Sequence, residues 1–334
     1  MPPPDAPPDA AVARFRRDLA DALGRSPDGP LALAVSGGPD SMAMLALAHA
    51  ALPGRILAAT VDHRLRAESA DEAAMVARWC HAAGVPHATL PVPAPPPAAA
   101  VPAWAREWRY ALLERWAVDD RRSVLLTAHH ADDQAETLLM RLGRGAGIPG
   151  LSGIRARREG GVCPPLVVVR PLLGWRRAEL RGVADTAGVP YVDDPSNRDP
   201  RFTRSQARAL LAEHRWLDPA NLSATAAHAA EAEGALDAWA VRCWQERRGD
   251  TAPPDVVLEV AELPRAIRRR LVHRAVGSVR ADATTCEGRW SAASDVSPLL
   301  DALEGGGTAT LAGVLGSARG TRWRFRPAPP RRSG

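Results

Sequence analysis

A glycine-rich turn between two apolar runs constrains this 334-residue chain more than any other segment does. The turn reads SGGPDS, residues 36–41; it follows the apolar residues 31–35 and precedes an Ala/Met/Leu-rich run to residue 47. A buried strand that leads through glycines into a helix directs unpaired backbone amides and the positive end of the helix dipole at one point, where an anion binds. Asp40 would repel a bare phosphate, but it suits a Mg²⁺ ion held between its carboxylate and phosphate oxygens. The plainer interpretation is an ordinary turn in which Asp40 or Ser41 caps the helix.

Short apolar runs alternate with longer amphipathic stretches from about residue 31 to residue 171. This alternation predicts a parallel α/β sheet flanked by helices. The predicted strands are residues 31–36, 56–62, 123–128 and 166–170, with a weaker candidate at 87–92. The predicted helices are residues 41–52, 68–84, 103–117 and 132–143.

The pattern changes after about residue 214, where alanine-rich helical stretches are followed by short β-like runs separated by glycines. This change predicts a smaller α+β C-terminal domain. We therefore expect a flexible lead and first helix at 1–28, a catalytic domain at 29–215, a second domain at 222–328 and a disordered tail at 329–334.

The composition excludes several classes of chemistry. All 43 basic residues are arginine, so a Walker A lysine, a Schiff base and a lysine nucleophile are excluded. The four cysteines, at positions 80, 163, 243 and 286, show no C-x-x-C pair and predict neither a disulfide framework nor a zinc site. The chain has no apolar run long enough to span a bilayer and no signal-peptide pattern at its start, so we expect a cytoplasmic protein without a membrane partner. The net charge of +5 leans weakly towards polyanionic partners.

A second polar cluster, TAHHADDQAETLL, also lies where an apolar strand ends and a helix begins. A helix that starts near Asp132 places Asp133, Glu136 and Thr137 on one face. His129 and His130 could donate to phosphate oxygens there, and Asp133 could help Asp40 to hold Mg²⁺. Two alternatives are an acidic first helical turn that complements the helix dipole and a metallohydrolase site, for which no second ligand cluster is present.

Residues 31–41 resemble the pyrophosphate loop (PP-loop) of the ATP pyrophosphatases, and the H-H-x-D-D-x-x-E-T string resembles the second signature of one subfamily, the tRNA(Ile)-lysidine synthetases. The resemblance implies a Rossmann-like parallel sheet that uses ATP and Mg²⁺. It also implies a set of ATP-binding residues: Ser36, Gly37, Gly38, Pro39, Asp40, Ser41, Asp62 and His63.

Further segments are similar to that family in the same order along the chain. VDHRLR, which begins at residue 61, carries Arg64 where the family has glycine. AREWRY supplies Arg106 and Arg109, which the resemblance places facing substrate anions, and RGAGIPGLSGI at 144–154 is similar to a mobile loop near the active site. RPLLGWRRAEL follows at 170–180.

The segment DDPSNRDPRFTRSQAR completes the resemblance. Asp194, Ser196 and Asn197 match the family's D-x-S-N, and Arg204 and Arg208 match two of its basic positions that bind tRNA or substrate. Ser205 and Gln206 replace an asparagine and an arginine of the family pattern. The resemblance also implies that residues 29–215 form the PP-loop ATP pyrophosphatase domain and that the second domain, residues 222–328, binds tRNA.

The resemblance implies that the wobble cytidine of a CAU-anticodon isoleucine tRNA becomes lysidine at the expense of ATP, with free L-lysine as the other substrate. Oxygen 2 of the cytosine attacks the α-phosphorus and expels pyrophosphate; the lysine amine then attacks carbon 2, and AMP leaves. In this scheme the catalytic residues are Asp40, His129, Asp133 and Glu136, and Asp40 and Asp133 also bind the Mg²⁺ ion. A monomer and a homodimer both stay open.

Three rival functions remain at this point. An amidotransferase-linked synthetase would need an ammonia source and different downstream motifs. A tRNA thiolase shares the loop, but we expect it to carry C-x-x-C pairs or a reactive cysteine near the site. A catalytically idle RNA-binding protein would explain the arginines, among them Arg268, Arg269 and Arg270 on a predicted helix, but not two Asp-bearing motifs at two strand ends.

Overall fold

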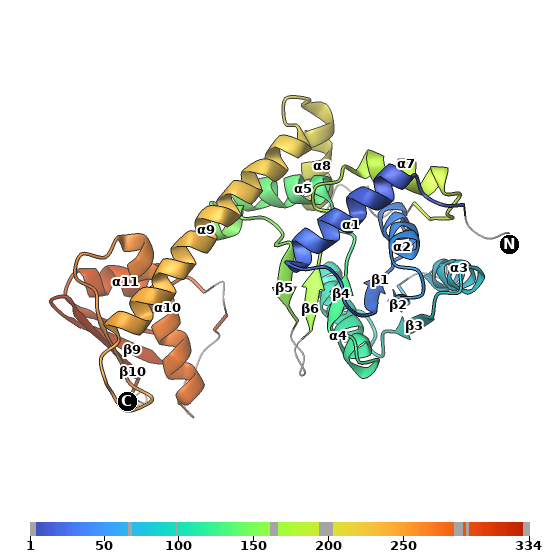
Figure 1. The fold of residues 1–334 in the computed structure, drawn as a ribbon. Coiled ribbons are helices and arrows are strands. Elements are labelled where there is room, and N and C mark those ends of the chain that lie inside the picture. The colour runs from blue at the N-terminus through green and yellow to red at the C-terminus, as the bar shows by residue number, and fades with distance from the viewer. Residues whose placement is uncertain are drawn as a thin grey trace. The chain divides into compact units, whose positions relative to one another are not determined.

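The computed structural model describes residues 5–65, 69–97, 99–160, 166–193, 203–283, 290–291 and 294–329 (Figure 1). The chain divides into two compact units, Met1–Ala230 and Glu231–Gly334, and the division falls inside the long helix α9 (Pro219–Arg247). Some sequence predictions fall outside the described residues: the D-x-S-N match at Asp194, Ser196 and Asn197, the cysteines at 163 and 286, and the tail from residue 330.

Unit 1 contains a six-stranded sheet in the order β3-β2-β1-β4-β6-β5. All neighbouring strands in it are parallel except β5, which runs antiparallel to β6 at the edge. The strands are β1 (Leu31–Ala34), β2 (Ile56–Asp62), β3 (His87–Pro91), β4 (Val124–Leu126), β5 (Arg157–Glu159) and β6 (Val167–Val169). This sheet, with helices on its faces, confirms the predicted fold class.

Helices cover both faces of this sheet, so its central strands are apolar at successive positions rather than at alternate ones. In β1, Leu31 and Leu33 join the core formed with α1, α2, α3 and α7, whereas Ala32 joins the core against α4. The helices of unit 1 are α1 (Asp9–Leu23), α2 (Pro39–Ala51), α3 (Ser69–Ala82), α4 (Val101–Asp119), α5 (Ala131–Leu142), α6 (Ile148–Leu151), α7 (Arg177–Thr186) and α8 (Thr203–Glu213). Helix α2 is buried on nearly all sides, in keeping with its run of alanine, methionine and leucine.

The chain changes direction across the sheet between β1 and β4. From β1 it proceeds outward to β2 and β3 on one side, and from β4 to β6 on the other. In open parallel sheets, ligands bind beyond the carboxyl ends of the strands at such a switch point. Both predicted polar motifs leave the sheet here, one after β1 and the other after β4.

Unit 2 has an antiparallel sheet in the order β7-β10-β9-β8. Its strands are β7 (Val256–Glu259), β8 (Thr308–Leu311), β9 (Val314–Arg319) and β10 (Arg322–Pro327). One face packs on α10 (Arg265–Asp282) and α11 (Ser297–Glu304) around Trp323 and Phe325. The expected α+β character of this region is confirmed.

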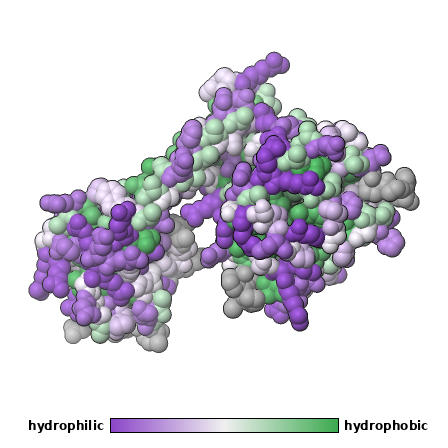
Figure 2. Space-filling view, in the orientation of Figure 1, coloured by the Kyte–Doolittle hydropathy of each residue, from purple (hydrophilic) through white to green (hydrophobic). Residues whose placement is uncertain are grey.

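Hydrophilic residues make up much of the surface seen in Figure 2, with apolar residues in smaller areas. None of the helices in the described ranges is both long and apolar enough to cross a membrane.

Candidate active site at the switch point of the parallel sheet

The SGGPDS turn is held in shape by its own hydroxyl groups. Ser41 Oγ donates to Gly38 O at 2.9 Å and accepts from Ser36 N at 3.1 Å, while the Ser36 and Ser41 hydroxyls lie 3.2 Å apart. Gly37 has φ +84°, a left-handed conformation that favours glycine. Pro39 starts α2, where its missing amide hydrogen costs no helical hydrogen bond. The loop therefore presents a preformed turn at the N-terminus of a buried helix.

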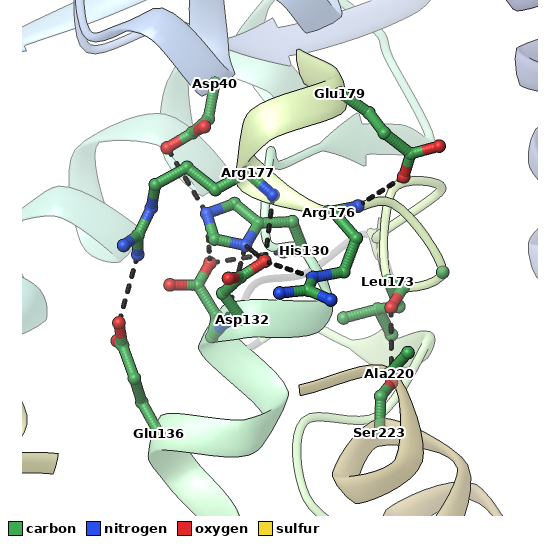
Figure 3. A network of polar contacts seen from close by, with 12 residues as sticks. Asp40, His130, Asp132, Glu136, Leu173, Arg176, Arg177, Glu179, Ala220 and Ser223 are labelled. Atoms are coloured by element: carbon green, nitrogen blue, oxygen red, sulfur yellow. Dashed lines mark hydrogen bonds and ion pairs between the residues drawn. The ribbon is translucent and has the colours of Figure 1, made fainter. Parts of the chain in front are cut away.

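Asp40 connects this loop to the second motif. Its Oδ2 lies 3.3 Å from His130 Nε2, as Figure 3 shows. Its Oδ1 is buried and has no hydrogen-bond partner among the described residues. Because a buried carboxylate oxygen without a partner is costly, this atom fits a ligand that supplies positive charge.

His130 also caps helix α5. Asp133 N donates to His130 Nδ1 at 3.4 Å, and His130 N donates to Asp133 Oδ2 at 3.1 Å, which makes a reciprocal capping box. With Nδ1 as the acceptor, Nε2 carries the proton and donates towards Asp40. The N-termini of α2 and α5 are thus joined through one buried imidazole.

The two adjacent histidines have opposite electrostatic surroundings. Burial lowers the pKa of His129 to about 3, aided by Arg170, Arg204 and Arg106 and opposed by Asp133. Burial also acts to lower the pKa of His130, but the Asp40 hydrogen bond and the Asp133 and Asp40 charges outweigh it, so the pKa of His130 is raised. His129 is therefore a neutral side chain whose Nδ1 lies 3.0 Å from Thr127 Oγ1.

Glu136 lies at the centre of an arginine cluster. Its Oε1 accepts from Arg177 at 3.0 Å and from Arg208 Nε at 2.8 Å, and its Oε2 accepts from Arg204 Nε at 2.6 Å. Arg204 also bonds Asp133 Oδ1. Burial tends to raise the pKa of Glu136, but the hydrogen bonds and charges of Arg208 and Arg204 outweigh it and lower that pKa. An ionised, buried carboxylate thus holds three guanidinium groups at the site.

Helix α7 is fixed to this site by Asp132. Its Oδ2 accepts from Arg177 N at 2.8 Å and from Arg176 Nε at 3.3 Å (Figure 3). Arg176 also pairs with Asp218 at 3.0 Å. These contacts place the Arg177 side chain between Asp40 and Glu136, as the close view shows.

The remaining predicted residues come from β2 and α4. Asp62 is the last residue of β2, and its Oδ1 accepts a hydrogen bond from Arg64 N at 2.9 Å. His63 follows directly after the carboxyl end of the strand. Burial lowers the pKa of His63 to about 4, with a further contribution from the charge of Arg109. Arg106 lies over the Tyr110 ring, 5.1 Å from its centroid, and its charge also acts on His129.

The structure therefore brings Ser36, Gly37, Gly38, Pro39, Asp40 and Ser41 together with Asp133, Glu136, Arg204 and Arg208. No contact joins Asp62 or His63 to Asp40 within the described ranges. The sequence patterns predict no role for Asp132 or Arg177, although Arg177 lies in the segment RPLLGWRRAEL. The signal that would have found Arg177 is a basic residue at the start of a helix that follows a strand of the same sheet.

The chain is similar to known proteins in sequence and in fold. Residues 12–215 match the model of the PP-loop domain family. The chain is 45% identical over 329 residues to a tRNA(Ile)-lysidine synthase of Novosphingobium aromaticivorans, covering 97% of this chain and 95% of that protein. It is 38% identical over 322 residues to the tRNA(Ile)-lysidine synthase of Zymomonas mobilis, covering 95% and 94%.

Among solved structures, the U34-tRNA thiolase NcsA of Methanococcus maripaludis is similar to this fold. Its TM-score is 0.55 at 16% sequence identity, covering 67% of this chain and 79% of the thiolase chain. At that identity the likeness shows the fold alone. Because the PP-loop model matches more than half of the chain and the relatives match nearly all of it, the chain belongs to the tRNA(Ile)-lysidine synthase family of PP-loop, ATP-using ligases.

Proposed function

We propose that this protein joins L-lysine to carbon 2 of the wobble cytidine in a CAU-anticodon isoleucine tRNA. ATP is converted to AMP and pyrophosphate in the reaction. The observation that carries the proposal is the Asp40–His130 contact, which unites the pyrophosphate loop and the second motif at one sheet edge. Both substrates that supply the acceptor and the energy, a tRNA and ATP, are expected in the cytoplasm.

The first half-reaction is adenylation. Cytosine O2 forms a bond to the α-phosphorus of ATP as the bond to the β-phosphate oxygen breaks, and pyrophosphate leaves. The amides of the 36–41 turn and the Ser36 and Ser41 hydroxyls are suited to bind the leaving pyrophosphate. In the second half-reaction the lysine amine attacks carbon 2, AMP leaves with the O2 oxygen, and the amine loses a proton.

Mg²⁺ fits the residues at this site. Asp40 Oδ1 is buried and accepts no hydrogen bond from any residue in the described ranges, whereas both oxygens of Asp133 already accept hydrogen bonds. Among the described residues no group of three His, Cys, Asp or Glu side chains is placed to hold a metal. This donor set suits Mg²⁺, which is bound by one or two carboxylates together with substrate phosphates. We assign Asp40 as its main ligand and Asp133 as the residue that orients His130 and Arg204. When bound, the ion would neutralise charge on the phosphate oxygens.

Glu136 is assigned to holding Arg177, Arg204 and Arg208. Three guanidinium donors occupy its two oxygens, and its pKa is lowered, so it is a poor acceptor for the lysine proton unless the cluster rearranges. The arginines that it holds are suited to ATP and tRNA phosphates. We assign His129 to donating a hydrogen bond from its neutral ring to a phosphate oxygen. Arg106 and Arg109 of α4 are assigned to binding substrate anions.

The cysteines disfavour the thiolase alternative. Cys80 and Cys243 are both buried, and they lie in different units of the protein. The sequence contains no C-x-x-C pair that would bring two thiols together.

The test measures AMP, pyrophosphate and labelled-lysine incorporation with a CAU-anticodon isoleucine transcript and with a methionine transcript. We expect these products with the isoleucine transcript and not with the methionine transcript, and we expect their formation to require lysine. Asp40→Asn should lower turnover at least about a hundredfold, because it removes the charge that faces the metal and His130. Its affinity for tRNA should stay within a few fold of the wild type.

Asp119→Asn is the matched control, because Asp119 is exposed and pairs only with its helix neighbour Arg115 among the described residues. It should turn over like the wild type. Lysine-independent AMP release with every tRNA would contradict the proposed reaction, and an active Asp40→Asn would remove Asp40 from it.

A further inference from the structure

Helix α4 carries an arginine and a tyrosine that lie together on its surface. Arg106 and Tyr110 are four residues apart, so they share one face of the helix. The guanidinium carbon of Arg106 lies over the Tyr110 ring, 5.1 Å from its centroid. This distance is within the range in which the negative face of an aromatic ring attracts a cation. The ring is therefore in a position to hold the Arg106 side chain.

Tyr110 is itself fixed from several sides. A second guanidinium group, that of Arg158 in β5, lies 4.5 Å from the ring centroid, and Arg158 also donates to the buried Glu114 at 2.6 Å. The side chain of Tyr110 forms a hydrogen bond with Arg170, which follows β6 and is 4% exposed. Arg170 in turn donates from Nη1 to Arg155 O at 2.6 Å. These contacts, together with the packing of the ring against the core beneath α4, tie the helix to the sheet.

The charges around Tyr110 agree with this arrangement. Burial acts to raise the pKa of Tyr110, but the Arg170 hydrogen bond and three nearby guanidinium charges outweigh it, so this pKa is lowered. The electron-rich ring and its oxygen thus lie among positive groups that repel one another. Tyr110 therefore stabilises the approach of Arg106 and Arg158 to the same place.

Arg106 has less support than Tyr110. Its side chain is exposed, and no carboxylate pairs with it in the ranges that the structure describes. Its charge acts on His129, the neutral histidine that follows β4. A carboxylate partner would neutralise Arg106 and compete with a substrate anion, whereas an aromatic face leaves the charge and the N–H donors available. Holding the side chain in advance also lowers the conformational entropy that anion binding would cost.

We propose that Tyr110 is a positioning residue that holds the guanidinium group of Arg106 for binding the phosphates of ATP. The charge of Arg106 acts on His129, which is assigned to a phosphate oxygen, so the two side chains are expected to contact the same anion. Tyr110 touches no substrate in this proposal and acts through Arg106 alone. The inference rests on the proposed function for the assignment of Arg106 to a substrate anion.

The test measures the affinity for Mg²⁺-ATP by equilibrium dialysis of labelled nucleotide, without tRNA or lysine. Arg106→Gln and Tyr110→Leu should each weaken ATP binding about tenfold, which corresponds to the loss of one charge-assisted contact. The double variant should also lose about tenfold rather than a hundredfold, because the second change removes a support whose target is already gone. Tyr110→Phe, which keeps the ring, should stay within about threefold of the wild type.

Trp116→Leu is the matched control. Trp116 lies on the same helix and packs against the same core as Tyr110, but no arginine lies over its ring among the described residues. It should leave ATP affinity unchanged even where it lowers the midpoint of thermal unfolding. Unchanged affinity in Arg106→Gln or Tyr110→Leu, multiplied losses in the double variant, or an equal loss in Trp116→Leu would overturn the inference. Because ATP binding is read without tRNA or lysine, a failure of lysidine formation would count against the proposed function and leave this result interpretable.

Discussion

At the scale of single residues, His63 predicts an acid-sensitive contribution to stability. Both of its ring nitrogens are buried without a hydrogen-bond partner in the described part of the chain, and burial lowers its pKa from 6.5 to about 4. The folded state thus favours the neutral ring. The contribution of His63 to folding stability is fully present above about pH 6.5, where its ring is neutral in the unfolded chain as well. This contribution is lost as the pH falls towards 4, because the unfolded chain binds a proton that the folded protein does not.

Replacing His63 with phenylalanine should therefore flatten this dependence. Between pH 7 and pH 5 the free energy of unfolding of the wild type should fall by roughly 1–2 kcal/mol more than that of His63→Phe. Urea denaturation at the two pH values measures the difference. Equal losses in the two proteins would show that His63 is free to protonate in the folded state.

Residue types and spacing predicted which residues meet at the candidate site better than they predicted the contacts between them. The convergence of the 36–41 turn with Asp133 and Glu136 could be predicted, because both motifs follow strands whose carboxyl ends meet at the same edge of a parallel sheet. Which histidine contacts Asp40 depends on how the chain leaves β4, and the spacing does not determine that. The three arginines on Glu136 come from α7 and α8, so their convergence follows from tertiary packing.

Arg64 illustrates the same limit. The family pattern has glycine at this position, and in this structure Arg64 has a left-handed backbone, with φ +52°. Glycine adopts this conformation without strain, whereas an arginine adopts it at some cost in strain. The sequence indicated the departure but not the backbone conformation of Arg64.

At the scale of elements, the glycine-rich segment after α5 is more firmly held than its composition suggests. Gln134 is buried; its Nε2 donates to Ile154 O at 2.8 Å and its Oε1 accepts from Ile154 N at 2.6 Å. Arg141 donates to Gly150 O and Gly153 O, each at 2.8 Å. The second half of the segment predicted to be a mobile loop is thus bonded to α5.

Two glycines of this segment provide a matched test. A Cβ on Gly153 would lie 2.3 Å from Gln134 Oε1 at a φ of +61°, whereas a Cβ on Gly147 meets nothing closer than 3.8 Å. Gly153→Ala should lower the free energy of unfolding by about 2–4 kcal/mol, from backbone strain and a displaced buried hydrogen bond. Gly147→Ala should change it by less than about 0.5 kcal/mol. Denaturant titration checks both, and similar values for the two variants would contradict this account.

The elements that could be predicted were those with a clear apolar period. Strands β1, β2, β4 and β6 and helices α2 to α5 follow the predicted ranges closely, because burial on both sheet faces leaves long apolar runs. Strand β5 has the sequence RRE and carries no such signal. It forms because the edge of β6 offers free backbone groups, which only the assembled sheet supplies.

At the scale of the whole molecule, each unit has its own hydrophobic core. Phe15 is fully buried in unit 1, and Trp323 is 2% exposed in unit 2. Because separate cores lose their packing independently, calorimetry should resolve two unfolding transitions. Trp323→Ala should lower the midpoint of one and Phe15→Ala that of the other, each removing about 3–5 kcal/mol of stability from its unit. A single transition lowered by both variants would show that the two cores unfold together.

The imidazole of His130, which contacts the N-termini of both α2 and α5, limits which segments can be exchanged between related proteins. His130 engages the pyrophosphate loop through one nitrogen and its own helix through the other, so neither motif keeps its full set of partners without the other. A chimera that takes residues 36–41 from a distant PP-loop enzyme while keeping 129–133 should assemble the sheet but misplace the ligands. Recombination within this superfamily should therefore preserve the two segments as a unit, although they are far apart in the gene.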